Sequence, residues 1–372
     1  MRSLVVVLGG ALVIGAAPRP GLELRSDDPA LSERHGFVFR AKARLTGVIV
    51  GPRSSRTFRD GLLDGTSRVW HPDGTRAELR QFREGRKTGT HRGWWPNGRR
   101  QFECTYAGDL AIGECRDWYA TGQLAAIHRY AAGVEAGLQQ GWDRAGSLQF
   151  SYEIRDGRRY GLLGSELCRP DSQGGRTLPY YGDSTLTPSF DADSTTVHRV
   201  GGFHLTDQRA RAVTERDFDG RITVATFFYV TCKDLCPRLE SRMAAVRAAF
   251  PHDPQVQIVS ITLAPNHDTA PVLTAYAHAN RIDDDGWRLL TGSAAEIARV
   301  AREGFFASAP MLRALTVGTN VAAAGQFHGE TIWLLDASRR VRGLYNGTMP
   351  LDTKRLIEDI TTLARIPAPR GG

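Results

Sequence analysis

The sequence predicts a chain in two parts, with an all-β array of repeated hairpins in the first half and an α/β domain in the second. Aromatic and glycine positions recur every 24 residues through the first half, which is typical of short stacked repeats. From about residue 200, strand-like and helix-like segments alternate, which predicts a central sheet covered by helices. One apolar run in this half ends at a cysteine pair, Cys232 and Cys236, and this pair carries the strongest functional signal.

The first 20 residues have the pattern of a signal peptide. After Met1 and Arg2, an uncharged run from Leu4 to Ala17 ends in small residues. The run is too short to span a bilayer comfortably, and no cysteine follows it as an acceptor for a lipid anchor. We therefore expect an exported, periplasmic protein, with membrane anchoring by an uncleaved leader as the alternative.

Composition narrows the function classes. The 372 residues predict about two globular domains, and the share of charged residues, 24%, is ordinary for such domains. The formal charge of +8 comes from 48 basic and 40 acidic residues, and only four of the basic residues are lysine. Because the basic residues are spread along the chain with no basic block, we expect no nucleic-acid partner.

The repeats run from about residue 47 to 166, after a linker or cap over residues 21–46. Each of four tryptophans is followed four residues later by a glycine: Trp70, Trp94, Trp118 and Trp142. The other half of each unit has an aromatic or apolar position (Phe58, Phe82, Tyr106, Tyr130 and Ile154) and a glycine position (Gly65, Gly89, Gly113, Gly137 and Gly161). A unit this small cannot bury its own apolar face, so we expect the aromatic side chains to pack as a stripe between neighbours.

Turn signals such as His71-Pro-Asp-Gly74 and Pro96-Asn-Gly98 predict that each unit is a β-hairpin. The pattern resembles MORN-type repeats in their bacterial form. That resemblance implies an elongated β-sheet scaffold for protein association or contact with a membrane surface, and it implies no catalysis. The tryptophans are interpreted as core residues in preference to ligand-stacking residues.

Three further cysteines lie in or near the array. Cys104 and Cys115 are eleven residues apart on successive predicted strands, and a disulfide between them is plausible in an exported protein. Cys168 is the odd one of the five cysteines in the chain. It is free, pairs with another chain, or pairs with one of the other two.

Residues 167–196 have linker composition, rich in Pro, Gly, Ser, Asp and Thr. The α/β domain follows over residues 197–368. We expect strands at 200–205, 222–230 and 256–262, helices near 236–250, 271–280 and 294–303, a hairpin at 331–335 and 341–345, and a helix over 351–364. In the first of these helices, four apolar residues recur at helical spacing and should face the sheet: Leu239, Met243, Val246 and Phe250.

Cys232 and Cys236 follow the apolar run Thr223–Val230 and precede Pro237 and an amphipathic stretch. A strand that delivers two thiols to the start of a helix places them where the positive helix end favours thiolate over thiol. Such a pair suits a soft metal or reversible disulfide chemistry. The alternative is a structural disulfide or two buried small apolar residues.

The second domain resembles the Sco/SenC family of copper proteins, which have a thioredoxin-like fold. The matching segments are Phe203–Asp207, Thr226–Tyr229, Cys232-Lys-Asp-Leu-Cys236-Pro237, Ser260–Thr262, Asp268-Thr269, Trp287–Gly292 and Phe327–Asp336. The resemblance covers about 170 residues, and the combination of C-x-x-x-C-P with a downstream histidine is specific. It implies that Cys232, Cys236 and His328 are copper ligands. Two thiolates and an imidazole also form a soft donor set that suits Cu(I) and tolerates Cu(II).

The sequence departs from the family pattern at two positions. Lys233 stands where the family often has proline, and Ala264 stands where it has an acidic residue. Asp234 matches and could orient a ligand. In the same loop as Ala264, His267 is interpreted as a surface residue in preference to a fourth ligand.

The resemblance implies an exported copper chaperone that delivers copper by ligand exchange to a respiratory (cytochrome c) oxidase subunit or another acceptor protein. The alternative is a metal-independent thiol–disulfide oxidoreductase in which Cys232 attacks and Cys236 resolves the mixed disulfide. That activity needs the two cysteines but not His328. A chaperone is favoured over an enzyme, and the repeats are interpreted as contacts to a partner or to the cell envelope.

Overall fold

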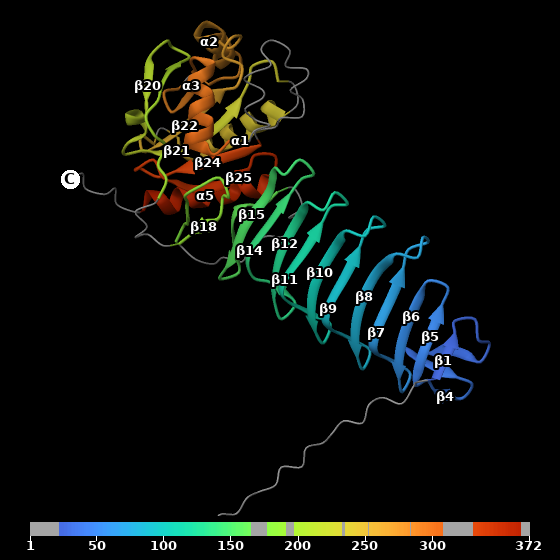
Figure 1. Cartoon of the computed structure of the whole chain (residues 1–372). Helices are drawn as coiled ribbons and strands as arrows, with labels where there is room; N and C mark the ends of the chain where they lie inside the picture. Colours follow the sequence, from blue (N-terminus) through green and yellow to red (C-terminus); the bar gives the residue numbers. More distant parts are fainter. Residues whose placement is uncertain are drawn as a thin grey trace, which may run out of the picture. The chain divides into compact units, whose positions relative to one another are not determined.

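The computed structural model in Figure 1 describes residues 22–164, 177–190, 197–232, 235–251, 253–282, 284–307 and 330–365. The chain divides into two compact units, residues 1–111 and 112–372. The predicted leader, residues 1–20, lies outside the described residues. Among the helices that are described, none has the length and apolar character needed to cross a membrane.

The first unit is a sheet of successive hairpins. Its strands lie in the order β1 (Leu22–Arg25), β5 (Gly47–Gly51), β6 (Ser54–Arg59), β7 (Leu62–Trp70), β8 (Arg76–Arg83), β9 (Arg86–Trp94) and β10 (Arg100–Ala107). β1 pairs with β5 in parallel, and every later pair is antiparallel. A small sheet of β2 (Leu31–Arg34), β3 (Phe37–Arg40) and β4 (Ala43–Arg44) lies within the same unit. The first strands share a small core of Leu24, Leu45, Ile49 and Phe58.

The turns explain why the 24-residue period gives hairpins. Gly74 and Gly98 adopt φ values of +84° and +78°, a region that costs a glycine little. At the other end of the strands, Glu84 and Gly85 both have positive φ, as type I′ turns require. The predicted array of β-hairpins is confirmed.

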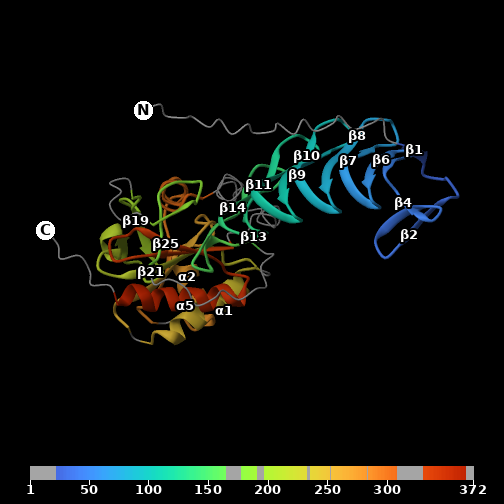
Figure 2. The same cartoon turned by 90° about the horizontal axis from the view of Figure 1, so that it is seen from below.

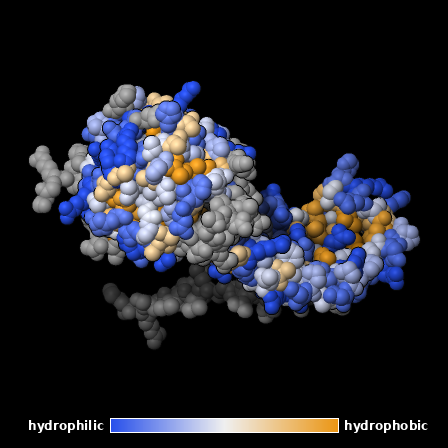
Figure 3. All heavy atoms as spheres, turned by 90° about the horizontal axis from the view of Figure 1, so that it is seen from above, coloured by the Kyte–Doolittle hydropathy of each residue, from blue (hydrophilic) through white to orange (hydrophobic). Residues whose placement is uncertain are grey.

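Side chains within the first unit pack between neighbouring hairpins. The ring of His91 lies 5.5 Å from that of Phe82 and 4.7 Å from that of Tyr106, measured between centroids. Trp94 is only half-buried, and the guanidinium groups of Arg76 and Arg100 lie 5.2 and 5.0 Å from its ring centroid. We expected the tryptophans to be core residues. Trp94 is more exposed than a core residue because it is the last residue of β9, where two arginine side chains cover its ring. Figure 3 shows apolar side chains on one face of the array, framed by hydrophilic ones.

The second unit begins with the last hairpins. Their strands are β11 (Leu110–Trp118), β12 (Leu124–Ala131), β13 (Val134–Glu135), β14 (Gly137–Trp142), β15 (Leu148–Arg155) and β16 (Arg158–Leu162), paired antiparallel. Cys115 and, in the first unit, Cys104 are each disulfide-bonded. Cys168 lies outside the described residues.

The rest of the second unit is a seven-stranded mixed sheet with helices on both faces. The strand order is β20 (Ala212–Thr214), β19 (His204–Asp207), β23 (Trp287–Thr291), β22 (Val256–Thr262), β21 (Ile222–Phe228), β24 (Thr331–Leu335) and β25 (Val341–Asn346). β21, β22 and β23 are parallel to one another, and the remaining pairs are antiparallel. The predicted α/β fold with a central sheet is confirmed.

Successive residues of the central strands enter two different cores. Ile222, Val224 and Phe228 of β21 pack with α1 (Leu235–Ala249), α2 (Ala270–Ala279) and α5 (Pro350–Ala364). Ala225 and Phe227 point to the other face, where they pack with α3 (Ala294–Arg299) and the π-helical turn that follows it, η2 (Val300–Gly304). Figure 2 shows α1 and α5 side by side on one face of the sheet. Of the four residues expected to face the sheet, Leu239, Met243 and Val246 are buried. The fourth, Phe250, follows the end of α1 and is partly buried against the same core.

The hairpin of β24 and β25 and the segment 177–190 both pack into the α/β core. Leu178 and Tyr181 in this segment are 1% and 0% exposed. The guanidinium group of Arg342 on β25 donates to the carbonyl oxygen atoms of Leu178 and Pro179 at 2.7 and 2.9 Å. The segment also contains two short paired strands, β17 (Tyr180–Tyr181) and β18 (Pro188–Ser189).

From β16, Arg158 donates to the carboxylate of Asp359 on α5 at 2.5 Å, and Tyr345 donates to the other oxygen atom of that carboxylate at 2.7 Å. Tyr160 on the same strand belongs to the core beside α1 and α5. The final repeat is therefore part of the hydrophobic core of the α/β region.

Candidate metal and thiol site

The two cysteines lie at the carboxyl end of β21. All seven residues of this strand are buried, which fixes the point at which the chain leaves the sheet. The backbone N–H of Cys232 donates to the carbonyl oxygen of Tyr229 at 3.2 Å and closes a turn. Cys236 lies in the first turn of α1, and its backbone N–H donates to the Sγ atom of Cys232 at 3.2 Å. An N–H aimed at sulfur stabilises the thiolate form of Cys232.

The two thiols differ in environment. Cys232 is partly exposed and Cys236 is buried, and the two cysteines are thiols that form no disulfide within the described residues. The neighbouring sulfur of Cys232 and burial raise the pKa of the Cys236 thiol. The expectation that the helix end favours the thiolate at both positions is therefore wrong for Cys236, because burial and a second sulfur outweigh the helix end there. Cys232 is the thiol that a partner or a metal can reach first.

Three further side chains that the sequence did not assign to the site belong to the surroundings of the thiols. Burial, and then the negative charge of Cys232, raise the pKa of Glu240 to about 7. The hydroxyl of Tyr276 on α2 donates to the Glu240 carboxylate. Burial and a hydrogen bond with Cys232 raise the pKa of Tyr229 to about 12. Glu240 lies one helical turn after Cys236, and that spacing is the only sequence signal that could have revealed it.

A small cavity lies behind Cys236. Its lining is mostly apolar, with Glu240, Thr226 and Ser260 as polar members. Ser260 accepts a hydrogen bond from the indole of Trp287 at 3.0 Å, and the hydroxyl of Thr226 is buried with no partner among the described residues. The low polarity of these surroundings favours a neutral thiol at Cys236.

The loop after β22 is tied to the cysteine loop by one carboxylate. Asp268 is 0% exposed. One of its oxygen atoms accepts from the backbone N–H of Val230 at 3.1 Å and from the hydroxyl of Thr262 at 2.5 Å. The other oxygen lies 2.7 Å from Nδ1 of His267. Asp268 therefore holds the chain two residues before Cys232 in place relative to β22.

The predicted third ligand, His328, lies outside the described residues, as do Lys233 and Asp234. Within the described ranges, no group of three or more His, Cys, Asp or Glu side chains is arranged to hold a metal ion. The structure thus brings together Cys232 and Cys236. The placement of His328 beside them stays a prediction.

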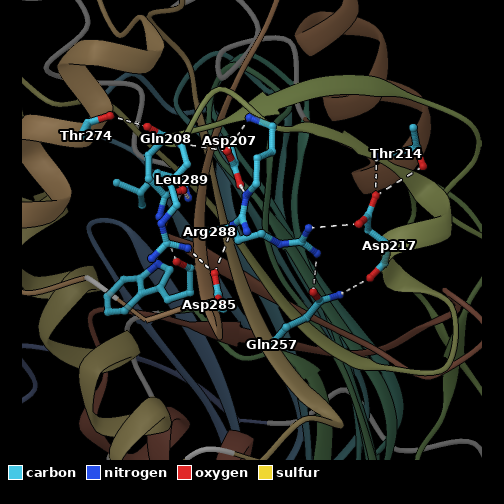
Figure 4. Close-up of polar contacts among 12 residues, drawn as sticks. Asp207, Gln208, Thr214, Asp217, Gln257, Thr274, Asp285, Arg288 and Leu289 are labelled. Atoms are coloured by element: carbon cyan, nitrogen blue, oxygen red, sulfur yellow. Dashed lines mark hydrogen bonds and ion pairs between the residues drawn. The ribbon is translucent and has the colours of Figure 1, made fainter.

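A second polar cluster lies at the opposite end of the parallel strands (Figure 4). The guanidinium of Arg288 at the start of β23 donates to the side chain of Gln257 at 2.6 Å and to Asp217 at 3.2 Å. Gln257 in turn donates to Thr223 at 2.8 Å. These bonds link the amino-terminal ends of three neighbouring strands with the 3-10 turn η1 (Glu215–Phe218), which indicates a structural role.

Known proteins resemble part of this chain. Residues 191–365 match the family model described as SCO1/SenC. The human protein SCO2 homolog, mitochondrial, is 37% identical over 106 residues, which are 27% of this chain and 38% of the relative. The chain therefore spans little more than a third of that relative's length.

Two solved structures are also similar to part of this chain. BsSco, described as a member of the Sco family of cytochrome c oxidase assembly proteins, is 21% identical, with 46% of this chain and 96% of that chain covered and a TM-score of 0.40. Bradyrhizobium japonicum ScoI with copper bound is 25% identical, with 44% and 99% covered and a TM-score of 0.35. Residues 191–365, which contain the central sheet and the cysteine pair, therefore resemble the SCO1/SenC family.

Proposed function

We propose that the C-terminal domain binds copper through Cys232, Cys236 and His328 and passes it to an acceptor protein in the cell envelope. The observation that carries this proposal is the pair of thiols at the end of a fully buried strand, with the N–H of Cys236 directed at the Sγ of Cys232. The SCO1/SenC match and a similar protein with copper bound support the choice of metal.

The donor set fits Cu(I). Two thiolate sulfurs are soft ligands, and soft ligands in a low-coordinate site select Cu(I) over harder divalent ions. Binding requires both thiols to lose their protons, so copper must displace the proton that burial favours on Cys236. His328 would complete the set as an imidazole donor, as the family resemblance implies.

Transfer would proceed by ligand exchange, with thiolates of the acceptor entering the copper site. Cys232 is the more exposed thiol, so it is released first, and the buried Cys236 leaves last. The acceptor that we propose is a copper centre of a respiratory oxidase subunit, because a similar structure is described as a cytochrome c oxidase assembly protein. The leader pattern at residues 1–20 supports an exported, periplasmic location.

Copper stoichiometry and Cu(I) affinity of the reduced protein, purified without oxygen, test this function. We expect one tightly bound copper per chain, and a loss of affinity of 100-fold or more in Cys232→Ser, Cys236→Ser and His328→Ala. His278→Ala is the matched control, because His278 is an exposed histidine of the same domain at the far end of α2. Absence of copper binding by the unmodified protein would refute the proposal.

A thiol–disulfide oxidoreductase is the second candidate, favoured by the unequal exposure of the two thiols. The Cys232 thiolate would attack a partner disulfide and release one partner thiolate. The Cys236 thiol, after losing its proton, would then displace the second partner thiol and leave a Cys232–Cys236 disulfide. Two electrons pass to the partner. Rapid disulfide exchange together with copper binding that is indifferent to His328→Ala would favour this candidate.

We also propose that the hairpin array docks the protein to a partner or an envelope surface. Because Tyr160 and Arg158 belong to the α/β core, deleting the whole array would damage the copper domain. An in-frame deletion of residues 47–94, which removes two 24-residue periods, avoids that damage. We expect unchanged copper binding and weakened partner association, and unchanged association would contradict a docking role.

A further inference from the structure

The loop between β22 and α2 places an imidazole beside the cysteine loop. Thr262 ends β22, and the following turn is closed by hydrogen bonds from His267 and Asp268 to the carbonyl oxygen of Ala264, at 3.0 and 2.8 Å. β21 and β22 are parallel, so this turn and the cysteine loop leave the sheet at the same edge. The Asp268 carboxylate joins the two loops through its bond to Val230.

The same carboxylate fixes the orientation of the His267 ring. An ionised carboxylate only accepts hydrogen bonds, so the 2.7 Å contact requires the proton to be on Nδ1 of His267. The lone pair of the neutral ring then lies on Nε2. The side chain is 48% exposed, and Nε2 has no hydrogen-bond partner within the described part of the chain.

This arrangement is one that metal-binding histidines use. A carboxylate that accepts from one ring nitrogen fixes the tautomer and raises the basicity of the other nitrogen toward a metal. Here the carboxylate is buried and held by Thr262 and Val230, so the ring is anchored to the sheet edge at which the cysteines lie. A surface histidine that binds nothing would not need a buried carboxylate to fix the orientation of its ring.

The ring does not form a three-residue cluster with the two cysteines, since the described side chains contain no such group. Its place, one carboxylate away from the backbone that precedes Cys232, suits a step in which copper enters or leaves.

We infer that His267 is an accessory copper ligand at the mouth of the site, used while Cu(I) is being loaded or released. This inference rests on the proposed copper function. In the release step the bond between Cu(I) and the Sγ of Cys232 breaks as a bond to Nε2 of His267 forms. Cys232 leaves as a thiolate, the copper keeps its oxidation state, and no electron or proton is consumed.

The test is the rate at which Cu(I) passes from the reduced, copper-loaded full chain to the chelator bathocuproine disulfonate. We expect His267→Ala and His267→Gln to slow release about fivefold while one copper per chain is still bound. The glutamine amide can still donate to Asp268, so this variant removes the metal donor and keeps the support of the cysteine loop. His278→Ala, on the exposed end of α2, should match the unmodified protein.

A direct readout is the nitrogen-15 NMR signal of the imidazoles during addition of Cu(I), supplied as its acetonitrile complex. The Nε2 signal of His267 should shift and that of His278 should not. Release by His267→Gln at the rate of the unmodified protein, or an unshifted His267 signal, would overturn the inference while leaving the copper function intact. Failure of the unmodified protein to bind copper would overturn both.

Discussion

The hairpin array and the α/β region bury their side chains in different ways. Every residue of β21 and β22 is buried, because helices cover both faces of the central sheet. In the array, most residues of a strand such as β12 are only partly buried. Its fully buried positions include polar side chains, such as Gln139, which bonds to the backbone of Arg129. The buried central sheet of the α/β region therefore holds the residues at its strand ends rigidly, as a binding site requires. The array is held together by contacts between neighbouring hairpins.

The largest expected effect on stability comes from a substitution in the core of the α/β region. Phe227 is 1% exposed and makes edge-to-face contacts with Phe305 and Trp333. Phe227→Ala should lower the free energy of unfolding of the α/β region by about 3–5 kcal/mol. The matched change Phe82→Ala in the array removes a half-buried ring and should cost about 1 kcal/mol, confined to neighbouring hairpins. Urea unfolding with hydrogen exchange measures both, and equal losses would erase the distinction between the two regions.

The second prediction concerns the ion pair of Arg158 in the last repeat with Asp359 on α5, which tests whether that repeat belongs to the α/β core. Arg158→Met removes one partner of a buried ion pair and leaves Asp359 without its cation, so unfolding of the α/β region should become easier by about 3 kcal/mol. Burial already raises the pKa of Asp359, which indicates that the carboxylate depends on its partners. Arg86 occupies the same repeat position three periods earlier and is exposed, so Arg86→Met is the control. A stability loss as small in Arg158→Met as in Arg86→Met would show that the last repeat is not part of the α/β core.

The sequence predicted the features that depend on local spacing. The four- and three-residue intervals from Leu239 identified the buried face of α1, and the period of 24 located turn glycines such as Gly74 and Gly98. Both patterns repeat within a few turns or strands, so a single chain is enough to see them.

Features that depend on distant residues were not predictable. Tyr181 lies in a segment of linker composition, yet it is fully buried because it packs with residues of β25. The pair of Arg158 and Asp359 is separated by 201 positions. At the site, the motif identified Cys232 and Cys236. The link from Asp268 to Val230 has no pattern of its own, because it depends on two strands lying side by side.

The pH dependence of stability should distinguish the cysteine site from the rest of the α/β region. The folded-state pKa of Glu240, about 7, lies above the ordinary value of a carboxyl group, because of burial and the charge of Cys232. The folded protein therefore holds this proton more tightly than the unfolded chain does. The stability that this bound proton contributes to the folded state is complete below the ordinary carboxyl pKa and is lost as the pH rises through 7.

Glu240→Gln should flatten this decline, with a gain over the unmodified reduced protein on the order of 2 kcal/mol at pH 8 and little difference near pH 4. Tyr276→Phe removes the hydroxyl that donates to the carboxylate and should steepen the decline. Denaturant unfolding at a series of pH values measures both. A gain in Glu240→Gln that is the same at pH 4 and pH 8 would exclude a titrating carboxyl as the cause.

The smallest effect should come from the arginines on the array surface. Arg76 and Arg100 lie on the ring of Trp94, and a cation–π contact at an exposed site is worth about 0.5–1 kcal/mol. Arg76→Met should therefore raise the hydrogen-exchange rate of β9 two- to fivefold and leave the α/β region unchanged. Arg99, exposed at the same turn as Arg100, provides the control variant Arg99→Met. If exchange in β21 also increased in Arg76→Met, the array would unfold together with the α/β core, and its repeats would not be the independent local units that their partly buried strands indicate.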